Sequence, residues 1–430
     1  MMARLNNRRH ARGAHDGPLW LLVWLSVALA HAVLLATRIA NAPSLPWGQL
    51  QAFGAYSVGL LLIWLLLRSR PASADGRLVA MVCFLMGIGL AIQFRMGVFA
   101  GGGGAGVVLA VPLGMGALMA VLVLAGRGRY RLLAGAGWVC YVLAVAGLAA
   151  MLVFGRRYRG GIYMPGNLNP SEIVKPLLVV FLAAFLSGRK ADFAETQAGL
   201  PMPPARTLWL FAALWALPVG LIVLLRDLGL LLLLNTVLVI MLYAVARRPG
   251  YLLVGGLGVL LSGWVVGVVS AHARARFDVW LDPFADPTGK GWQILQGLSA
   301  MYAGGLWGAG IGAGAPQTIP IVSSDFVYAA LAEELGIIAC ALIVLVFVAL
   351  TWRGWSIAAR ARGPFGVLLG VGLTATLAVQ ALLNVGGVVK AIPMTGIPLP
   401  FISQGGSSLI ATLVAAGLLA AMAEGRKGNP

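Results

Sequence analysis

Residues 274–336 read RARFDVWLDPFADPTGKGWQILQGLSAMYAGGLWGAGIGAGAPQTIPIVSSDFVYAALAEELG, which is the only long polar-tolerant stretch between two apolar spans of this chain. It contains six acidic residues: Asp278, Asp282, Asp286, Asp325, Glu333 and Glu334. They are nearly half of the 13 acidic residues in the whole sequence. Because acidic side chains are costly at membrane depth and are rarely kept there without a role, we expect the chemistry of the protein in this stretch.

The composition of the chain is that of a protein embedded in a membrane. Hydrophobic residues make up 60% and charged residues 10%, and the mean hydropathy is +0.92. Soluble globular proteins carry about 25% charged residues. We therefore expect an all-α, polytopic helical membrane protein. The three cysteines lie in apolar runs and the four histidines are scattered, so neither a disulfide framework nor a histidine-based metal site is expected.

Twelve apolar stretches approach the roughly 20 residues that a transmembrane helix needs. The sequence therefore predicts about 12 transmembrane helices, at residues 18–37, 49–67, 78–95, 105–125, 132–154, 171–188, 207–225, 228–246, 250–270, 326–350, 364–386 and 407–423. The basic segment before the first of these leads into a span that is too long for a signal peptide, so no cleavage is expected.

The distribution of basic residues predicts the orientation of these helices. With the N-terminus in the cytoplasm, cytoplasmic segments hold 20 of the 31 Lys and Arg residues, outer segments hold 10, and Lys175 lies inside a span. This excess agrees with the positive-inside rule, so we expect both termini in the cytoplasm and residues 274–325 outside. The net charge of +18 then follows from topology, and no nucleic-acid partner is expected.

Asp325 lies where the polar stretch ends and the next apolar span begins. Its carboxylate is either a base at the rim of an outward cavity or an acid that caps the helix and is favoured by the helix dipole. Position alone favours the capping interpretation. Glu333 and Glu334 follow about 12 Å further along the helix. For them, structural hydrogen bonding is at least as well supported as catalysis.

Other charges lie near the predicted outer ends of spans. Glu172 and Lys175 share a helix face, which predicts a buried ion pair that braces the helix. Arg226 separates two spans, where it either holds an anion or pairs with Asp227. Several outer cations run against the positive-inside trend: Arg156, Arg157, Arg159, Arg226 and Lys390. They indicate an anionic ligand such as a diphosphate, or contact with lipid headgroups, and they fit an enzyme and a transporter equally.

Five motifs resemble, in order, those of the SEDS family, which comprises cell-wall proteins of the FtsW, RodA and SpoVE types. The run IPMTGIPLPFISQGGSSLI at 392–410 resembles the family signature. Four more segments agree with it: NPSEIVK (169–175), RDLG (226–229), GWQILQGLSAMYAGGLWGAGIG (291–312) and SSDFVYAALAEELG (323–336). The resemblance covers residues from about 78 to 424, and the conserved order of five motifs makes it specific.

The resemblance implies a fold with a ten-helix core, cytoplasmic ends and its longest outer loop between the seventh and eighth helices. Setting the first two predicted spans aside brings the loop at 271–325 into that place. We therefore expect residues 1–77 to form a basic cytoplasmic N-terminus with two extra transmembrane helices. Residues 78–430 are expected to form the glycosyltransferase core.

The resemblance also implies an activity, which is peptidoglycan glycan-strand polymerisation from lipid II. The family's essential aspartate falls on Asp325, which is expected to act as base on the acceptor hydroxyl while undecaprenyl diphosphate leaves with inversion. A divalent cation, Mg²⁺ or Mn²⁺, is implied as cofactor. A class B penicillin-binding protein that crosslinks the growing strand is implied as partner. The implied location is the bacterial cytoplasmic (inner) membrane, in contact with membrane lipid.

The matched motifs and the outer cations supply the remaining candidate residues. We expect substrate contacts from Arg226, Asp227, Arg157, Arg159, Lys390, Gln293, Gln296, Ser403 and Ser407. Supporting roles are expected for Glu172, Lys175, Glu333 and Glu334. The chain departs from the family pattern at several positions near these motifs: Leu225, Arg226, Ile321, Ser323 and Thr395. Substrate and metal contacts near Asp325 are therefore expected to differ from those that the resemblance implies.

Two other functions fit the same resemblance. A flippase for a lipid-linked precursor would need a route to the cytoplasmic face and would form no glycan. A non-catalytic scaffold for a penicillin-binding protein would tolerate the loss of Asp325. The sequence is compatible with both cell elongation and cell division, and the absence of a lysine at position 395 favours a RodA type slightly.

Overall fold

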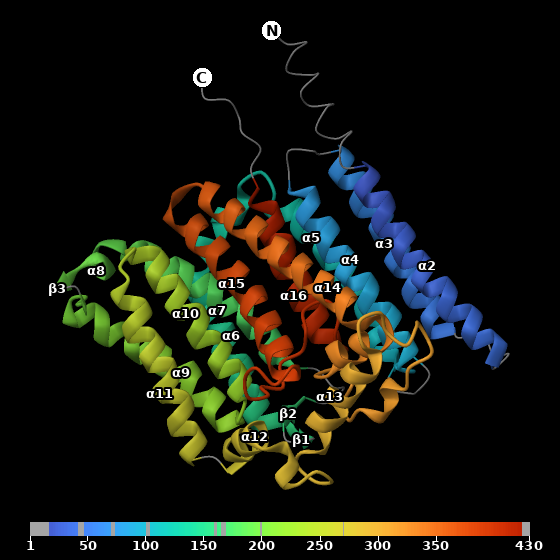
Figure 1. Cartoon of the computed structure of the whole chain (residues 1–430). Helices are drawn as coiled ribbons and strands as arrows, with labels where there is room; N and C mark the ends of the chain where they lie inside the picture. The colour runs from blue at the N-terminus through green and yellow to red at the C-terminus, as the bar shows by residue number, and fades with distance from the viewer. Residues whose placement is uncertain are drawn as a thin grey trace. The chain divides into compact units, whose positions relative to one another are not determined.

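The computed structural model describes residues 17–41, 47–69, 74–99, 104–158, 161–164, 169–197, 200–269 and 271–423. Within these ranges, 10 helices are long and apolar enough to cross a membrane, and two shorter apolar helices accompany them. Every predicted span therefore contains a helix (Figure 1). The chain is a polytopic helical membrane protein, as the sequence predicts.

The helices that occupy the predicted spans have the following bounds: α2 Gly17–Asn41, α3 Trp47–Ser69, α4 Gly76–Arg95, α5 Gly104–Ala125, α6 Gly137–Phe154, α7 Pro170–Gly188, α9 Ala205–Leu225, α10 Leu228–Ala246, α11 Gly250–Val269, α14 Val327–Arg360, α15 Gly363–Val388 and α16 Gly406–Ala421. The largest difference from prediction is at α14, which runs ten residues beyond position 350. Its added length carries two basic residues, Arg353 and Arg360, so hydropathy alone ends the span too early.

The predicted loop at 271–325 is only partly irregular. It contains the helices α12 (Ala271–Leu281) and α13 (Trp292–Gly304) and the 3₁₀ turns η3 (Pro283–Ala285) and η4 (Pro316–Thr318). The other small elements are η1 (Arg129–Ala134), α8 (Lys190–Ala194), β1 (Arg156–Tyr158), β2 (Gly161–Tyr163), β3 (Thr196–Gln197) and β4 (Leu200–Pro201). β1 pairs with β2 and β3 with β4, both antiparallel. Strands of two or three residues are too short to show an alternating pattern, so the sequence does not reveal them.

Packing divides the chain into two compact units. The first consists of Met1–Tyr130, Gln296–Ile357 and Pro398–Pro430, and the second of Arg131–Leu295 and Ala358–Ile397. Segments that are distant in sequence thus meet within each unit, because neighbouring helices in a bundle need not be consecutive in the chain.

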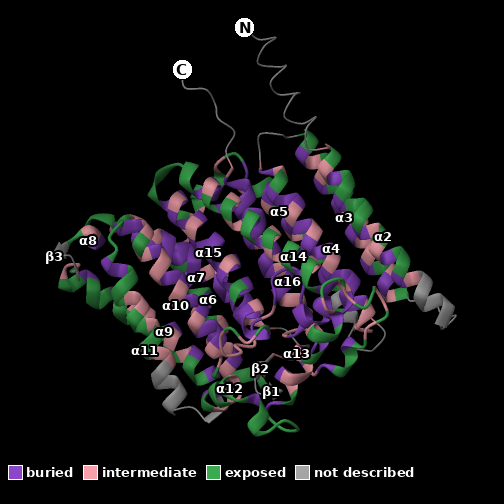
Figure 2. Cartoon of the chain, in the orientation of Figure 1, coloured by how far each residue is buried: buried purple, intermediate pink, exposed green. Residues whose placement is uncertain are grey.

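In the first unit, α16 packs against α5 and α4, while α2 lies along α4 and α3 along α5 (Figure 1). Most of α4 is buried (Figure 2). The two N-terminal helices fit closely on it, since Val27 of α2 and the Tyr56 hydroxyl of α3 both reach Gly87. The predicted division at residue 77, between an N-terminal addition and a core, stays a prediction.

In the second unit, α15 packs against α10 and α7, and α6 lies between α7 and α9. A row of rings links the last three helices. The ring centroids of Tyr141 and Phe181 are 4.5 Å apart, and those of Phe185 and Phe211 are 5.6 Å apart. Such tilted pairs contribute beyond simple area burial, so this row fixes the spacing of the helices that carry the polar groups described below.

Polar residues at the helix starts are placed by capping. Asn169 accepts from the Ser171 N–H at the start of α7, and Pro170 follows in the first helical position, where its missing N–H costs nothing. Asp227 accepts from the Leu230 N–H at the start of α10. Arg226 ends α9 in the left-handed conformation, with φ +59°. These caps fix the residues at which α7 and α10 begin and at which α9 ends.

Candidate active site

Asp325 is half-buried in the first unit, two residues before α14 begins. Its backbone N–H donates to the Ile321 carbonyl at 3.3 Å. The carbonyl of Phe326 accepts from the Ala329 and Ala330 N–H groups and so begins the helix. The predicted position at the junction of loop and helix is confirmed. This position fits both the base interpretation and the capping interpretation.

The C-terminal motif holds the backbone just before Asp325. The Ser403 hydroxyl donates to the Ser324 carbonyl at 2.5 Å and accepts from the Leu399 N–H at 2.8 Å. The Gln404 N–H donates to the Ser323 carbonyl at 2.7 Å. Ser403 is buried, and both its bonds are to the protein. Its observed role is thus to fix the turn that carries Asp325, and a substrate contact by Ser403 stays a prediction.

Glu333 and Glu334 are buried further along α14. Glu334 forms an ion pair with Arg95 of α4, with 2.7 Å between Oε1 and Nε. Glu333 Oε1 accepts from the Ala315 N–H at 2.8 Å. Both glutamates therefore make the hydrogen bonds that the structural interpretation predicts, and their supporting role stays a prediction.

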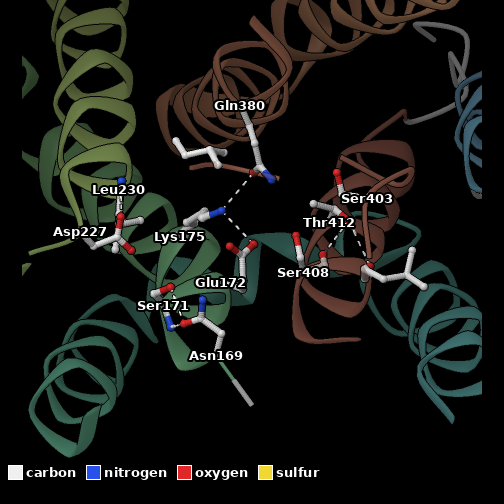
Figure 3. Close-up of polar contacts among 12 residues, drawn as sticks. Asn169, Ser171, Glu172, Lys175, Asp227, Leu230, Gln380, Ser403, Ser408 and Thr412 are labelled. Carbon is white, nitrogen blue, oxygen red and sulfur yellow. Dashed lines mark hydrogen bonds and ion pairs between the residues drawn. The ribbon is translucent and has the colours of Figure 1, made fainter. Parts of the chain in front are cut away.

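Glu172 and Lys175 form the predicted ion pair at the start of α7 in the second unit. Lys175 Nζ lies 2.8 Å from Glu172 Oε2, and the two side chains are only 5% and 7% exposed. Lys175 also donates to Gln380 Oε1 of α15 at 3.2 Å (Figure 3). The buried Lys175 ammonium group thus links α7 to α15, whereas the predicted pair involves α7 alone.

Asp227 belongs to the same unit, and its carboxyl interacts with the charges of Glu172 and Lys175. Burial raises the pKa of its carboxyl above the ordinary value, while the Leu230 N–H and the Lys175 charge oppose this rise. Glu172 adds to the rise, and Arg276 opposes it. Asp227 is therefore easier to protonate than a surface aspartate, because cap and cations offset only part of its desolvation.

Arg226 is exposed, and among the described residues it forms no ion pair with Asp227. The pairing interpretation of this arginine is therefore not supported, and anion binding stays a prediction. Lys390 is half-buried, with Nζ 3.5 Å from the Leu281 carbonyl. Its own carbonyl accepts from Trp280 Nε1 at 3.0 Å, which ties the segment that follows α15 to α12.

The remaining predicted contacts fall in three places. Gln293 and Gln296 lie half-buried on α13, and Ser407 lies half-buried in the first turn of α16. The Arg157 side chain and the whole of Arg159 lie outside the described residues. The first unit thus brings Asp325, Ser403, Glu333 and Glu334 onto one connected framework. The second gathers Glu172, Lys175 and Asp227.

Three polar residues that the sequence reasoning missed complete these frameworks. Arg95 binds Glu334, and Arg276 of α12 donates to the Met394 and Thr395 carbonyls at 3.3 and 2.8 Å. Asn384 donates to the Ile397 carbonyl at 2.8 Å. For Arg95 and Asn384, a lone arginine or amide inside an apolar span was the available signal, since polar groups at that depth require partners. Arg276 lies in the polar stretch at 274–336, where a further arginine gives no such signal.

The described residues contain no group of three or more His, Cys, Asp or Glu side chains that could hold a metal ion. A cage made of protein side chains alone therefore does not fit this part of the chain. Mg²⁺ commonly takes one or two carboxylates and completes its shell with phosphate oxygens and water.

The comparisons with known proteins agree with the motifs. The FtsW/RodA/SpoVE family model, described as cell cycle protein, matches residues 105–428. The "Peptidoglycan glycosyltransferase RodA" of Mycobacterium tuberculosis strain H37Rv is 32% identical over 429 residues, covering 95% of this chain and 90% of the relative. "Stage V sporulation protein E" of Bacillus subtilis is 38% identical over 257 residues, covering 59% and 68%.

A solved structure is similar as well. It is described as "Structural coordination of polymerization and crosslinking by a peptidoglycan synthase complex". The TM-score is 0.67 at 27% sequence identity, and the match covers 83% of this chain and 99% of the other. The likeness therefore extends to the fold as well as to the motifs.

Proposed function

Since this chain belongs to the FtsW/RodA/SpoVE family, we propose that it is a peptidoglycan glycosyltransferase that polymerises glycan strands from lipid II. The observation that carries the proposal is the placement of Asp325. It follows a turn that is fixed by Ser403 and Gln404, and it precedes a helix whose buried glutamates are bonded to the same loop. A residue whose backbone is held on both sides is suited to a reaction that depends on orientation.

Asp325 acts as the base in the proposed mechanism. It takes the proton from the acceptor sugar hydroxyl as the oxygen attacks the anomeric carbon of the donor. The bond from that carbon to the diphosphate oxygen breaks, and undecaprenyl diphosphate leaves with the electron pair. A single carboxylate suffices for this inverting displacement. The diphosphate needs charge neutralisation rather than a general acid. Arg226, which is exposed, and Lys390, which is half-buried, are the proposed contacts for that charge.

A divalent cation remains a separate proposal. Because the described residues form no metal cage, an Mg²⁺ or Mn²⁺ ion would take most of its ligands from the lipid diphosphate and water. We assign no step of the reaction to the ion.

We propose a class B penicillin-binding protein as the partner of this chain. The similar solved structure is described as a complex that coordinates polymerisation with crosslinking, which supports such a partner. The bacterial cytoplasmic membrane is the proposed location, with both termini in the cytoplasm. The excess of Lys and Arg in the segments assigned to the cytoplasm supports this orientation.

The test of this function is the Asp325→Asn variant in a lipid II polymerisation assay with purified protein. We expect polymer formation to fall by about 10²–10⁴-fold, which is the usual contribution of a general base. The matched control is Asp278→Asn, which removes the same charge from an exposed position of α12 and should leave the rate unchanged.

Undiminished polymer from Asp325→Asn would overturn the catalytic assignment. Asp282 or Asp286 would then be the next candidates, although both accept bonds from their own turns. A flippase would move lipid II without forming polymer, and a scaffold would support a penicillin-binding protein equally well with either residue at position 325. The same assay, run with and without the partner, separates these alternatives.

A further inference from the structure

The guanidinium of Arg95, the last residue of α4, binds three groups. Its Nε lies 2.7 Å from Glu334 Oε1, and its Nη2 donates to the carbonyls of Gly312 and Gly314 at 3.0 and 2.5 Å. The planar fork of an arginine suits such a task, because several of its donors are held in a fixed arrangement. The side chain is 21% exposed, so these bonds are only partly screened by solvent.

The glycine loop, residues 305–315, is also bonded to the two glutamates directly. Glu334 Oε2 accepts from the Gly312 N–H at 3.1 Å, while Glu333 Oε1 accepts from the Ala315 N–H. Arg95 thus binds the carbonyl of Gly312, and Glu334 binds the N–H of the same residue. This peptide is fixed from both sides.

The helix α14, which carries the two glutamates, is interrupted at Gly336, two residues after Glu334. Gly336 has φ +82° and ψ +169°, which only glycine adopts readily and which splits α14 into a short first part, residues 327–335, and a long second part. The polar groups exposed by the break are bonded to the glycine loop. Ala309 and Gly310 donate to the Glu333 and Glu334 carbonyls, and Ile337 donates to the Gly305 carbonyl.

Asp325 lies inside the loop that these bonds close. The chain leaves the glycine loop, passes through residues 316–326 and returns in the first part of α14 to the glutamates. From Glu334 back to Asp325 the distance along the helix is about 13 Å, at 1.5 Å per residue. Arg95 therefore acts on Asp325 only through Glu334 and the glycine loop.

We propose that Arg95 is a positioning residue for the polymerase reaction, because it sets the orientation of the Asp325 carboxylate through Glu334 and the Gly312 peptide. The proposal rests on the function proposed above. A base that is displaced by about 1 Å can lose about 10²-fold in rate even when the change lies far from the chemistry. An ordinary structural brace would lower stability without this effect on turnover.

The chain offers a matched control for that distinction. Arg353, on the same helix α14, donates through Nε and Nη2 to Asp75 Oδ2 at 2.9 and 2.6 Å. This pair also joins α14 to the start of α4, but it lies in a different part of both helices, at the other end of α4 from Arg95. Loss of Arg353 should therefore lower the melting temperature while leaving the turnover of the folded protein unchanged.

The experiment compares Arg95→Met, Arg95→Lys, Glu334→Gln and Arg353→Met in steady-state lipid II polymerisation. We expect Arg95→Met to lower kcat by about 10–100-fold, as expected for a misplaced base, while KM changes less than kcat. Arg95→Lys should recover part of the loss, because lysine keeps the charge but not the fork. Glu334→Gln should resemble Arg95→Met. Equal kcat values for Arg95→Met and Arg353→Met would overturn the proposal.

Hydrogen exchange gives a second measurement that does not depend on activity. The N–H groups of Gly312 and Ala315 should exchange faster in Arg95→Lys and Arg95→Met than in Arg353→Met. If the exchange of these two N–H groups were unchanged in Arg95→Lys, Arg95 would not hold the glycine loop and the proposal would be overturned. The lysine variant gives this test even if the methionine variant inserts poorly into the membrane. Absence of polymer from the wild-type protein, together with the expected exchange, would instead count against the proposed function.

Discussion

At the residue scale, Asp227 shows how one side chain meets opposing demands. Its Oδ1 caps α10 by accepting from the Leu230 N–H at 2.9 Å, which favours the ionised form. Burial acts in the other direction and is the larger effect, so the pKa of the carboxyl lies above its ordinary value. The folded protein therefore binds a proton at Asp227 over a pH range in which the unfolded chain has released it.

This difference predicts a pH-dependent effect of Asp227→Asn. Asparagine caps helices about as well as aspartate, but it carries no charge to desolvate. Wild-type stability falls as pH rises from the ordinary aspartate value of 3.8 through the raised value, and the variant lacks this loss. Between pH 4 and 8, the melting temperature of Asp227→Asn should therefore exceed that of the wild-type protein by an amount that grows as the pH rises. A gap that is the same at every pH would contradict the raised pKa.

The residue scale also marks the limit of what the sequence predicts for the site. The position of Asp325 and the Glu172–Lys175 pair follow from local spacing, and both are confirmed. For Arg226 the sequence leaves anion binding and a pair with Asp227 open. The left-handed backbone at Arg226 makes it the end of α9, and among the described residues it forms no ion pair with Asp227. Local spacing identifies partners on one helix and does not reveal how a turn directs neighbouring side chains.

At the element scale, the buried charge on α7 depends on a second helix. Lys175 donates to Glu172 and to Gln380, whose position in the sequence is 205 residues away. A contact of that range has no signature in a single sequence. The same holds for Arg276, which donates from α12 to carbonyls 118 and 119 residues later.

The Glu172–Lys175 pair makes a second prediction about stability. Glu172→Ala leaves the Lys175 charge buried without its counter-charge, and such a loss costs about 3–5 kcal/mol in a fully buried pair. The double change Glu172→Ala and Lys175→Met removes both charges and should recover much of this loss. The measurement is the melting temperature of the detergent-purified variants. Equal stability of the single and double variants would show that the pair contributes little.

At the scale of the whole molecule, the 12 helices were predictable and their grouping was not. Hydropathy identifies each span, because lipid requires an apolar surface on every helix. The two compact units each combine segments from distant parts of the chain, and only side-chain fit selects those partners. The glycine loop between α13 and α14 is another case. Its glycines are visible in the sequence, but its bonds to Glu333 and Glu334 are not.

Most of the two N-terminal helices lies within the stretch that the mycobacterial RodA matches. That match covers 95% of the sequence, so one-twentieth of the chain lies outside it, which is fewer residues than the 41 up to the end of α2. The family model begins only at residue 105. Because α2 and α3 pack against α4 and α5, we expect them to be an integral part of the first unit rather than a loose addition.

Gly87 of α4 tests this expectation. A Cβ atom there would meet Val27 of α2 and would lie 3.0 Å from the Tyr56 hydroxyl of α3. Gly87→Ala should therefore destabilise the protein by about 1–3 kcal/mol, as overpacking of a close contact usually does. Gly54→Ala on α3, where nothing lies within 4 Å, is the matched control and should be neutral or slightly stabilising. Adding Val27→Ala to Gly87→Ala should restore part of the melting temperature, since it removes the obstructing methyl groups. If both glycine variants have the same melting temperature as the wild-type protein, α2 and α3 are not packed tightly on α4.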